Sequence, residues 1–438
     1  MADFEQYFRG KKVTVVGLGL LGKRLGDIAF LAECGAEVLV TDLKSAKELA
    51  PSIKKLGKYK NIKYVLGEHR FQDFENRDFI LKGQGVALDS PYIAHARSKG
   101  IPVEMDESLF AKLVSKLNLK VKIIGVTGTR GKSTATILIY EILKAGGVRV
   151  HLGGNIKGTA ALPLLKEVKD GDTVVFELSS WQLQGFGEAK ISPQMAVFTN
   201  FMSDHLNYYN NDLEQYFLDK SFIYKFQKKG DLLVLGKNIK DKVGKVKSKV
   251  IIADPNAVPL AWKINLLGKH NLENIACALE IARFLKIDEK IIKKAVENFE
   301  AVSGRLELVK NVRGVKIYND TNSTTPEATI VALESFSDKV ILIMGGVDKG
   351  ISTDNLSAVL SQKTKKVFLT PGSGSDKIEN RKADIEKVVN LEEALKKTMQ
   401  IAKQGDIILF SPAFASFNMF KNEYDRGDKF MKIVKQLK

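Results

Sequence analysis

Val121-Lys-Ile-Ile-Gly-Val126-Thr-Gly128-Thr-Arg-Gly-Lys-Ser-Thr134 is the stretch of sequence that decides the fold. Its apolar start predicts a buried strand, and residues 135–144 after it predict a helix. Gly128 and Gly131 let backbone N–H groups close around a phosphate, and the helix N-terminus adds positive potential there. Lys132 has the reach to contact β- and γ-phosphates, and the Ser133 hydroxyl suits Mg²⁺. The stretch therefore predicts a nucleoside triphosphate site between a strand and a helix.

This loop is shorter than a general P-loop, because the glycine expected five residues before the Gly-Lys pair is replaced by Val126. The alternative interpretation is a glycine-rich turn with a chance lysine. The strand and the helix that flank the loop count against that alternative, since a phosphate loop requires both.

A second glycine motif opens the chain, in Lys12-Val-Thr-Val-Val-Gly17-Leu-Gly19-Leu20-Leu21-Gly22. A strand, this turn and a helix to about Cys34 are followed by a second strand that ends in Asp42, twenty residues after Gly22. The pattern is the fingerprint of a site where a diphosphate sits on a helix N-terminus and a carboxylate receives a ribose hydroxyl. A UDP-sugar satisfies it as well as NAD does, so an NAD oxidoreductase stays open at this point.

Strands and helices alternate along the whole chain, which predicts three α/β units with mostly parallel sheets. We expect a Rossmann-like domain over residues 1–112, a central P-loop ATPase-like domain over 113–302, and a Rossmann-like domain over 303–438. Ligands of such sheets lie outside the carboxyl ends of the strands. Glu177 and residues 200–205 each follow a short apolar run, so we expect them beside the bound triphosphate.

Composition is that of an ordinary globular protein, with 438 residues, 44% hydrophobic and 27% charged. The sequence has no run of about 18 apolar residues and no basic-then-apolar start, so we expect a cytoplasmic protein without a membrane partner. Cys34 and Cys277 lie in apolar helical contexts and are expected to be buried packing residues. The net charge of +17 invites a nucleic-acid hypothesis. The lysines are spread without an arginine-rich arm or zinc spacing, so we expect no nucleic-acid partner.

Several motifs in the same order along the chain resemble the Mur ligase family, and most closely its glutamate-adding members. The resemblance covers nearly the whole chain and rests on Gly128–Thr134, His151-Leu-Gly-Gly-Asn155-Ile, Glu177-Leu-Ser-Ser-Trp-Gln-Leu183, Asn200-Phe-Met-Ser-Asp-His205, Gly268-Lys-His-Asn271-Leu-Glu-Asn274, Gly304-Arg305-Leu-Glu, Tyr318-Asn-Asp320 and Ser411-Pro-Ala-Phe-Ala-Ser416-Phe-Asn-Met-Phe-Lys421. It implies a monomeric enzyme that uses ATP and Mg²⁺ to join D-glutamate to UDP-N-acetylmuramoyl-L-alanine. The carboxylate is first phosphorylated, and the amine then attacks the acyl phosphate. All partners are anionic, so the chemistry needs cations that neutralise charge and align the reactants.

The resemblance also assigns roles to individual residues. Lys132, His205 and Lys220 match catalytic positions, and Lys220 matches a lysine that becomes carbamoylated and so gains oxygen ligands. The metal ligands implied are Ser133, Glu177, His205 and Lys220. The ATP-binding residues implied are Gly128, Thr129, Arg130, Gly131, Lys132, Ser133, Thr134, Asn271, Arg305 and Asp320. The substrate-binding residues implied are Gly17, Gly19, Leu20, Leu21, Asp42, Asn155, Ser179, Lys349 and Ser416.

Two departures from the family pattern touch the amino-acid pocket. Asn322 stands where a lysine is usual, and Glu423 stands where a phenylalanine is usual. The identity of the amino acid is therefore open, with L-glutamate as the alternative acceptor. A folylpolyglutamate-type ligase of the same superfamily is a further alternative, although the turn from Gly17 to Gly22 argues against it.

Overall fold

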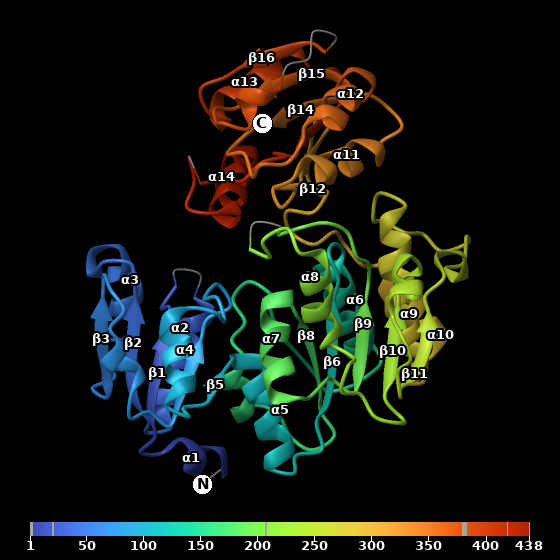
Figure 1. The fold of residues 1–438 in the computed structure, drawn as a ribbon. Coiled ribbons are helices and arrows are strands. Elements are labelled where there is room, and N and C mark those ends of the chain that lie inside the picture. The colour runs from blue at the N-terminus through green and yellow to red at the C-terminus, as the bar shows by residue number, and fades with distance from the viewer. Residues whose placement is uncertain (1–2, 20–21, 206–207, 379–382, 418, 438) are drawn as a thin grey trace. The chain divides into compact units, whose positions relative to one another are not determined.

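The computed structural model describes residues 3–19, 22–205, 208–378, 383–417 and 419–437 of the chain (Figure 1). The chain forms two compact units, Met1–Pro259 with Glu273–Ala295 and Leu260–Leu272 with Val296–Lys438. Three parallel-rich sheets run through these units, two in the first and one in the second. The α/β class predicted from the sequence is confirmed.

The first sheet has the order β3-β2-β1-β4-β5, and all its pairs are parallel. Its strands are β1 (Lys12–Val16), β2 (Glu37–Asp42), β3 (Ile62–Leu66), β4 (Phe79–Lys82) and β5 (Val103–Glu104), with helices α1 (Asp3–Phe8), α2 (Lys23–Glu33), α3 (Ala46–Leu56), α4 (Pro91–Ser98) and the 3₁₀ turn η1 (Phe71–Phe74). The strand predicted before the glycine motif is β1, and the helix predicted after it is α2. Strand β1 is the central strand of this sheet. Its side chains are buried on both faces, as those of Val13, Val15 and Val16 show.

The central sheet has the order β11-β10-β9-β6-β8-β7 and is also parallel throughout. Its strands are β6 (Lys122–Thr127), β7 (Val150–Gly154), β8 (Thr173–Glu177), β9 (Met195–Phe198), β10 (Leu232–Leu235) and β11 (Lys249–Ile252). The helices are α5 (Asp106–Lys116), α6 (Lys132–Ala145), α7 (Ser180–Ala189), α8 (Leu213–Ser221), α9 (His270–Phe284) and α10 (Glu289–Glu297), with the 3₁₀ turns η2 (Leu162–Lys166), η3 (Lys237–Lys242) and η4 (Pro255–Ala257). The P-loop strand β6 lies in the middle of the sheet, so the loop after it is flanked by the ends of β8 and β9.

The first and central sheets share one hydrophobic core, which contains residues from α2, α5, η2 and the two sheets. A Cβ added at Gly26 of α2 would lie 2.7 Å from the Cβ of Ala160. The next residue, Asp27, is fully buried, and its Oδ1 accepts a hydrogen bond of 3.0 Å from the Leu162 backbone N–H. Helix α2 therefore fixes the first sheet against the start of η2.

The third sheet has the order β12-β13-β17-β14-β15-β16. Its strands are β12 (Glu307–Val312), β13 (Val315–Asn319), β14 (Val340–Met344), β15 (Thr364–Leu369), β16 (Ile385–Lys387) and β17 (Ile407–Phe410), with helices α11 (Pro326–Glu334), α12 (Asp354–Lys363), α13 (Leu391–Ile401), α14 (Glu423–Gln436) and the 3₁₀ turn η5 (Ser375–Lys377). Only β12 runs antiparallel among the pairs that the structure describes here. Buried side chains on both faces of this sheet form two clusters.

Two other expectations can be checked. Cys34 and Cys277 are free and buried, as predicted, and burial raises the pKa of Cys34 to about 11 and that of Cys277 to about 12. None of the helices described here is both long and apolar enough to cross a membrane.

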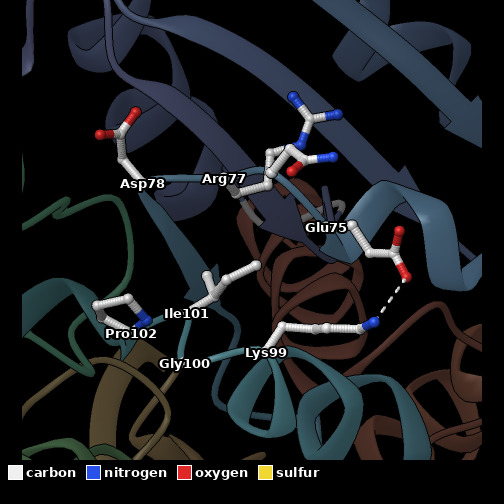
Figure 2. Close-up of a pocket in the computed structure, with 8 residues that line it drawn as sticks. Glu75, Arg77, Asp78, Lys99, Gly100, Ile101 and Pro102 are labelled. Carbon is white, nitrogen blue, oxygen red and sulfur yellow. Dashed lines mark ion pairs between the residues drawn. The ribbon is translucent and has the colours of Figure 1, made fainter.

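A polar cleft of about 510 Å³ opens at the amino ends of β4 and β5 (Figure 2). Its lining residues are Glu75–Asp78 and Lys99–Pro102. Ligands of parallel α/β sheets bind at the carboxyl ends of the strands. This cleft therefore lies at the end of the first sheet opposite its glycine turn.

Candidate active site

The P-loop joins β6 to α6 and depends on two glycines. Gly128 has φ of 148°, and a Cβ there would lie 1.9 Å from the Thr199 Oγ1. Gly131 has φ of 78°, caps α6, and would place a Cβ 2.0 Å from the Asn274 Oδ1. Any side chain at either position would force the loop away from its neighbours. The loop therefore keeps this backbone conformation only with glycine at both positions.

The segment after β9 holds the P-loop from the side. The Thr129 and Arg130 backbone N–H groups donate to the Asn200 backbone and side-chain oxygens at 2.9 and 2.8 Å. The Arg130 guanidinium lies 2.9 Å from an Asp204 carboxylate oxygen. Burial opposes ionisation of Asp204, but Arg130 and His205 outweigh it and lower the pKa of this carboxyl. Asn200 and Asp204 therefore lie beside the loop, and their expected position beside the triphosphate stays a prediction.

Two lysines converge on one carbonyl of the loop. The Lys132 Nζ donates to the Gly128 and Thr129 carbonyls at 3.0 and 3.1 Å. The Lys220 Nζ donates to the same Gly128 carbonyl at 2.9 Å and lies 4.7 Å from the centre of the Tyr216 ring. Lys220 is 2% exposed, and burial together with the charge of Lys132 holds its pKa well below the usual value. Lys220 lies in the last turn of helix α8, which ends at Ser221.

Glu177 ends β8 beside the P-loop strand and is 2% exposed. Its Oε1 accepts a 3.0 Å hydrogen bond from the Asn155 side chain, and its backbone carbonyl accepts from the Asn155 N–H at 2.8 Å. Among the described residues, the Glu177 Oε2 has no hydrogen-bond partner although it is buried. Ser133 is 8% exposed and lies in the first turn of α6, the helix that follows the P-loop strand β6. An orphaned buried carboxylate oxygen with a hydroxyl on the adjoining element fits a hard divalent cation.

His205 has φ of 54°, a left-handed conformation that few non-glycine residues adopt. Its ring lies 4.8 Å from the Trp181 ring and 6.1 Å from the Tyr216 ring. The side chain of His205 is 42% exposed. The imidazole therefore lies beside the Trp181 and Tyr216 rings and is partly exposed.

Ser179 caps α7 through a capping box with Gln182. Its Oγ donates to the Gln182 Oε1 at 2.9 Å, and the Gln182 Nε2 donates to the Glu107 Oε1 at 2.6 Å. The Glu107 carboxyl also forms a short ion pair with Lys23, at the start of α2. Burial, the neighbouring Asp106 and the weaker opposing charge of Lys23 leave the pKa of Glu107 above its usual value. A line of polar side chains therefore joins the N-terminus of α2 to Ser179.

In the N-terminal glycine turn, the acid at the end of β2 accepts backbone hydrogen bonds. Gly17 and Gly19 have positive φ of 86° and 68°. The Asp42 Oδ2 accepts from the Leu18 N–H at 2.8 Å, and its Oδ1 accepts from the Lys44 N–H at 2.9 Å. The Oδ2 atom of Asp42 thus bonds the glycine turn, and its Oδ1 atom bonds the loop that follows β2. The expected contacts Leu20 and Leu21 lie outside the described residues.

In the second unit, the two residues expected at the amino-acid pocket lie on neighbouring loops. Val347 and Ala415 form an antiparallel bridge, with the Val347 N–H donating to the Ala415 carbonyl at 2.8 Å. Lys349 follows two residues after that bridge, and Ser416 follows directly. The Lys349 Nζ donates to the Thr324 Oγ1 at 2.9 Å.

Asp320 is buried within the same unit. Its carboxylate accepts from the Leu306 N–H at 3.1 Å and from the Ser323 and Ser411 hydroxyls at 2.5 and 2.8 Å. Burial raises the pKa of Asp320 to about 6. The remaining ATP-site expectations, Asn271 and Arg305, also belong to this unit, near the start of α9 and just before β12.

Sequence reasoning did not single out Arg426, the largest fully buried side chain of the described residues. Its guanidinium donates to the Thr321 carbonyl at 2.8 Å and to the Phe414 carbonyl at 3.0 Å. It thereby ties the loop after β13 to the loop that carries Ser416. Sequence reasoning also missed Glu107, which accepts a hydrogen bond from Gln182. The Ser-x-x-Gln spacing from Ser179 to Gln182 does predict the capping box that positions Gln182.

Comparison with known proteins accounts for this arrangement. Three family models match in chain order: "Mur ligase MurD-like, N-terminal domain" at residues 11–104, "Mur ligase middle domain" at 126–257 and "Mur ligase, glutamate ligase domain" at 304–414. The chain is 37% identical to the UDP-N-acetylmuramoylalanine–D-glutamate ligase of Borreliella afzelii, with 97% of each chain covered. It is 34% identical to the ligase of that name from Roseiflexus sp., with 97% of this chain and 98% of the relative covered.

Solved structures show the same fold at lower identity. UDP-N-acetylmuramate-alanine ligase MurC from Thermotoga maritima has a TM-score of 0.64 at 20% identity, covering 98% of this chain and 100% of that one. The MurF ligase of Thermotoga maritima in complex with ADP has a TM-score of 0.61 at 19% identity, covering 91% and 94%. With relatives above 30% identity over almost its full length, the chain belongs to the Mur ligase family.

Proposed function

We propose that this enzyme adds D-glutamate to UDP-N-acetylmuramoyl-L-alanine, a cytoplasmic step of peptidoglycan precursor synthesis. As a Mur ligase it is an ATP-dependent, ADP-forming amide ligase. The observation that carries the finer proposal is the match, over nearly the full length of both chains, to several ligases that bear this name.

The reaction proceeds in two group transfers. The terminal carboxylate oxygen of the UDP-linked substrate attacks the γ-phosphorus of ATP, and ADP leaves. The amine of the amino acid then attacks the acyl carbon, loses a proton, and the tetrahedral intermediate expels phosphate. We assign Lys132 to the β- and γ-phosphates, because its ammonium needs only to exchange two loop carbonyls for phosphate oxygens.

The orphaned oxygen of Glu177 supports a Mg²⁺ site that Ser133 completes, with His205 and Lys220 as the ligands of a second ion. When bound, these ions supply positive charge that neutralises the triphosphate and the acyl phosphate. Asn155 keeps the other Glu177 oxygen occupied and so fixes the direction of the free one. Carboxylates that bind metals typically accept a hydrogen bond of this kind from a neighbouring side chain.

Lys220 suits carbamoylation because burial lowers the pKa of its amine. A neutral amine nitrogen attacks CO₂, forms an N–C bond, and releases one proton to give an anionic carbamate. The buried position of Lys220 and the adjacent Lys132 both favour the uncharged amine that this step needs. The carbamate would put two oxygen atoms, which can bind Mg²⁺, in the place of the positively charged ammonium of Lys220.

The amino acid is assigned to the second unit, where Lys349 and Ser416 follow the Val347–Ala415 bridge. An ammonium and a hydroxyl suit the two carboxylates of glutamate. A neutral amino acid would lack the side-chain carboxylate that can form a charge-assisted hydrogen bond with Lys349. Against this, Asn322 and Glu423 change the charge of the pocket, so L-glutamate is the competing acceptor.

We assign residues 1–112 to the UDP-sugar, 113–302 to ATP and 303–438 to the amino acid. We further propose a monomer that acts on these small molecules without a nucleic-acid or membrane partner.

ATP-dependent phosphate release tests the proposal directly. We expect release with UDP-N-acetylmuramoyl-L-alanine plus D-glutamate, and much less with L-glutamate, D-aspartate or glycine at equal concentration. A higher kcat/KM for another amino acid would contradict the D-glutamate assignment and leave the ligase class intact. Turnover without the UDP-linked substrate would favour the folylpolyglutamate-type alternative, and NAD reduction would favour an oxidoreductase.

A further inference from the structure

The loop that follows β4 is held in place from within. Lys82, the last residue of β4, is fully buried, and its ammonium donates to the Gly83 carbonyl at 3.2 Å and to the Val86 carbonyl. The Val86 N–H donates back to the Gly83 carbonyl at 3.1 Å, closing a turn. Arg24 of α2 donates to the Lys82 carbonyl at 3.2 Å. The turn of residues 83–86 is therefore fixed on both sides.

Gln84 lies in this turn and faces two residues of the central domain. Its Nε2 is 3.4 Å from the Asn155 Oδ1, and its Oε1 is 3.5 Å from the Ser179 Oγ. Both distances are long for a hydrogen bond, whose N–H···O length is usually about 2.9 Å. Asn155 and Ser179 direct their short bonds elsewhere, to Glu177 at 3.0 Å and Gln182 at 2.9 Å.

The Gln84 carboxamide thus has unused capacity. A glutamine side chain offers two N–H donors and an oxygen with two lone pairs. The fixed backbone of the turn places the group between Asn155 and Ser179, and its two long contacts leave most of that capacity unused. A group fixed in this way loses little conformational entropy when a ligand takes over its hydrogen bonds.

We propose that Gln84 is a third contact for the peptide end of the UDP-linked substrate, supplied by the first domain alongside Asn155 and Ser179. Its N–H donors suit the carboxylate or the amide carbonyl of an N-acyl amino acid. The inference rests on the proposed function and deepens it, because Gln84 belongs to the domain assigned to the UDP-sugar and faces Asn155 and Ser179, two residues expected to bind the substrate. Gln84 is then a specificity residue for the acyl substrate, with no role toward ATP.

Calorimetric binding to the full chain tests this assignment, with UDP-N-acetylmuramoyl-L-alanine and UDP as separate probes. Gln84→Ala should weaken the UDP-linked substrate about tenfold or more, the range expected for losing hydrogen bonds to a charged group. Gln84→Glu keeps the size but places an anion near the substrate carboxylate, so it should weaken binding further. Affinity for UDP and the KM for ATP should stay within twofold of wild type, about the scatter of such measurements.

Gln72→Ala is the matched control, because Gln72 is an exposed glutamine of the same domain. It should bind both probes as the wild type does. Equal affinity of wild type and both Gln84 variants for the UDP-linked substrate would overturn the role of Gln84 and leave the proposed function standing. An equal loss of affinity for UDP would also overturn it, since that result points to a disturbed domain. A wild-type protein that does not bind the UDP-linked substrate would overturn the proposed function itself.

Discussion

Replacing Lys23 by methionine tests the buried polar line between α2 and Ser179. The Lys23 ammonium lies 3.3 Å from the Asp106 Oδ2 and forms the short ion pair with Glu107. The side chains of Asp106 and Glu107 are 2% and 0% exposed, so water cannot replace the lost cation. Removing one partner of a buried ion pair costs about 3–5 kcal/mol, because the remaining charge is left uncompensated.

For a unit of this size, 1 kcal/mol shifts Tm by about 2–4 °C, so we expect the Lys23→Met transition to fall by about 10 °C. Differential scanning calorimetry of the full chain measures the shift. The loss should be smaller at pH 5 than at pH 8. Without Lys23, the folded-state pKa values of both carboxyls rise above their unfolded values, and such groups lose stability as pH rises through the folded pKa.

Two further variants make this test specific. Lys63→Met removes an exposed lysine from β3 and should change stability by no more than about 0.5 kcal/mol. Adding Glu107→Gln to Lys23→Met removes one of the two stranded acids and should restore part of the lost Tm. If Lys23→Met melted within 2 °C of the Lys63→Met control, which is less than the shift expected for about 1 kcal/mol, the reasoning about the buried pair would be refuted.

Three other predictions concern the site. Lys132→Ala should lower phosphate release at least about a hundredfold in a folded protein, because the loop loses the cation that neutralises the transferred phosphate; near-normal release would remove the loop from the ATP site. Lys220→Ala should be inactive, and acetate or formate should partly restore it by supplying carboxylate oxygens; activity without added carboxylate would refute the carbamate. Asp320 has its folded pKa raised from 3.8 to about 6, so the second unit should lose up to about 3 kcal/mol as pH rises from 4 to 6. Urea unfolding of Asp320→Asn should lack this slope, and an equal slope in both proteins would contradict the prediction.

Much of the fold is predictable because the buried strands are short apolar runs. The short apolar runs at residues 173–177, 315–319, 340–344 and 407–410 predict strands, and β8, β13, β14 and β17 have these bounds. Strand β12, Glu307–Val312, was missed, because an edge strand that mixes charged, polar and apolar residues lacks that signal. The mixed character of the third sheet could therefore not be inferred from the sequence.

The phosphate loop could be predicted for a different reason, since all its essential residues are local in sequence. The contacts of Lys23 with Glu107 and of Arg426 with Thr321 join residues 84 and 105 positions apart. A buried lysine or arginine looks like a surface charge until the fold is known. The hydrogen bonds from the Leu18 and Lys44 backbone N–H groups to Asp42 were likewise not predicted from the sequence, because its motif indicates only a ribose contact.

The contact of Gly26 with Ala160 limits how this enzyme can be recombined with its relatives. A Cβ at position 26 would come within 2.7 Å of that alanine, and the next residue, Asp27, bonds the Leu162 N–H. A chimera cut in the linker before β6 would separate these partners and combine surfaces that were never selected together. Domain shuffling should therefore succeed only when residues 26–27 and 160–162 come from the same parent, so the two N-terminal domains are inherited as one module.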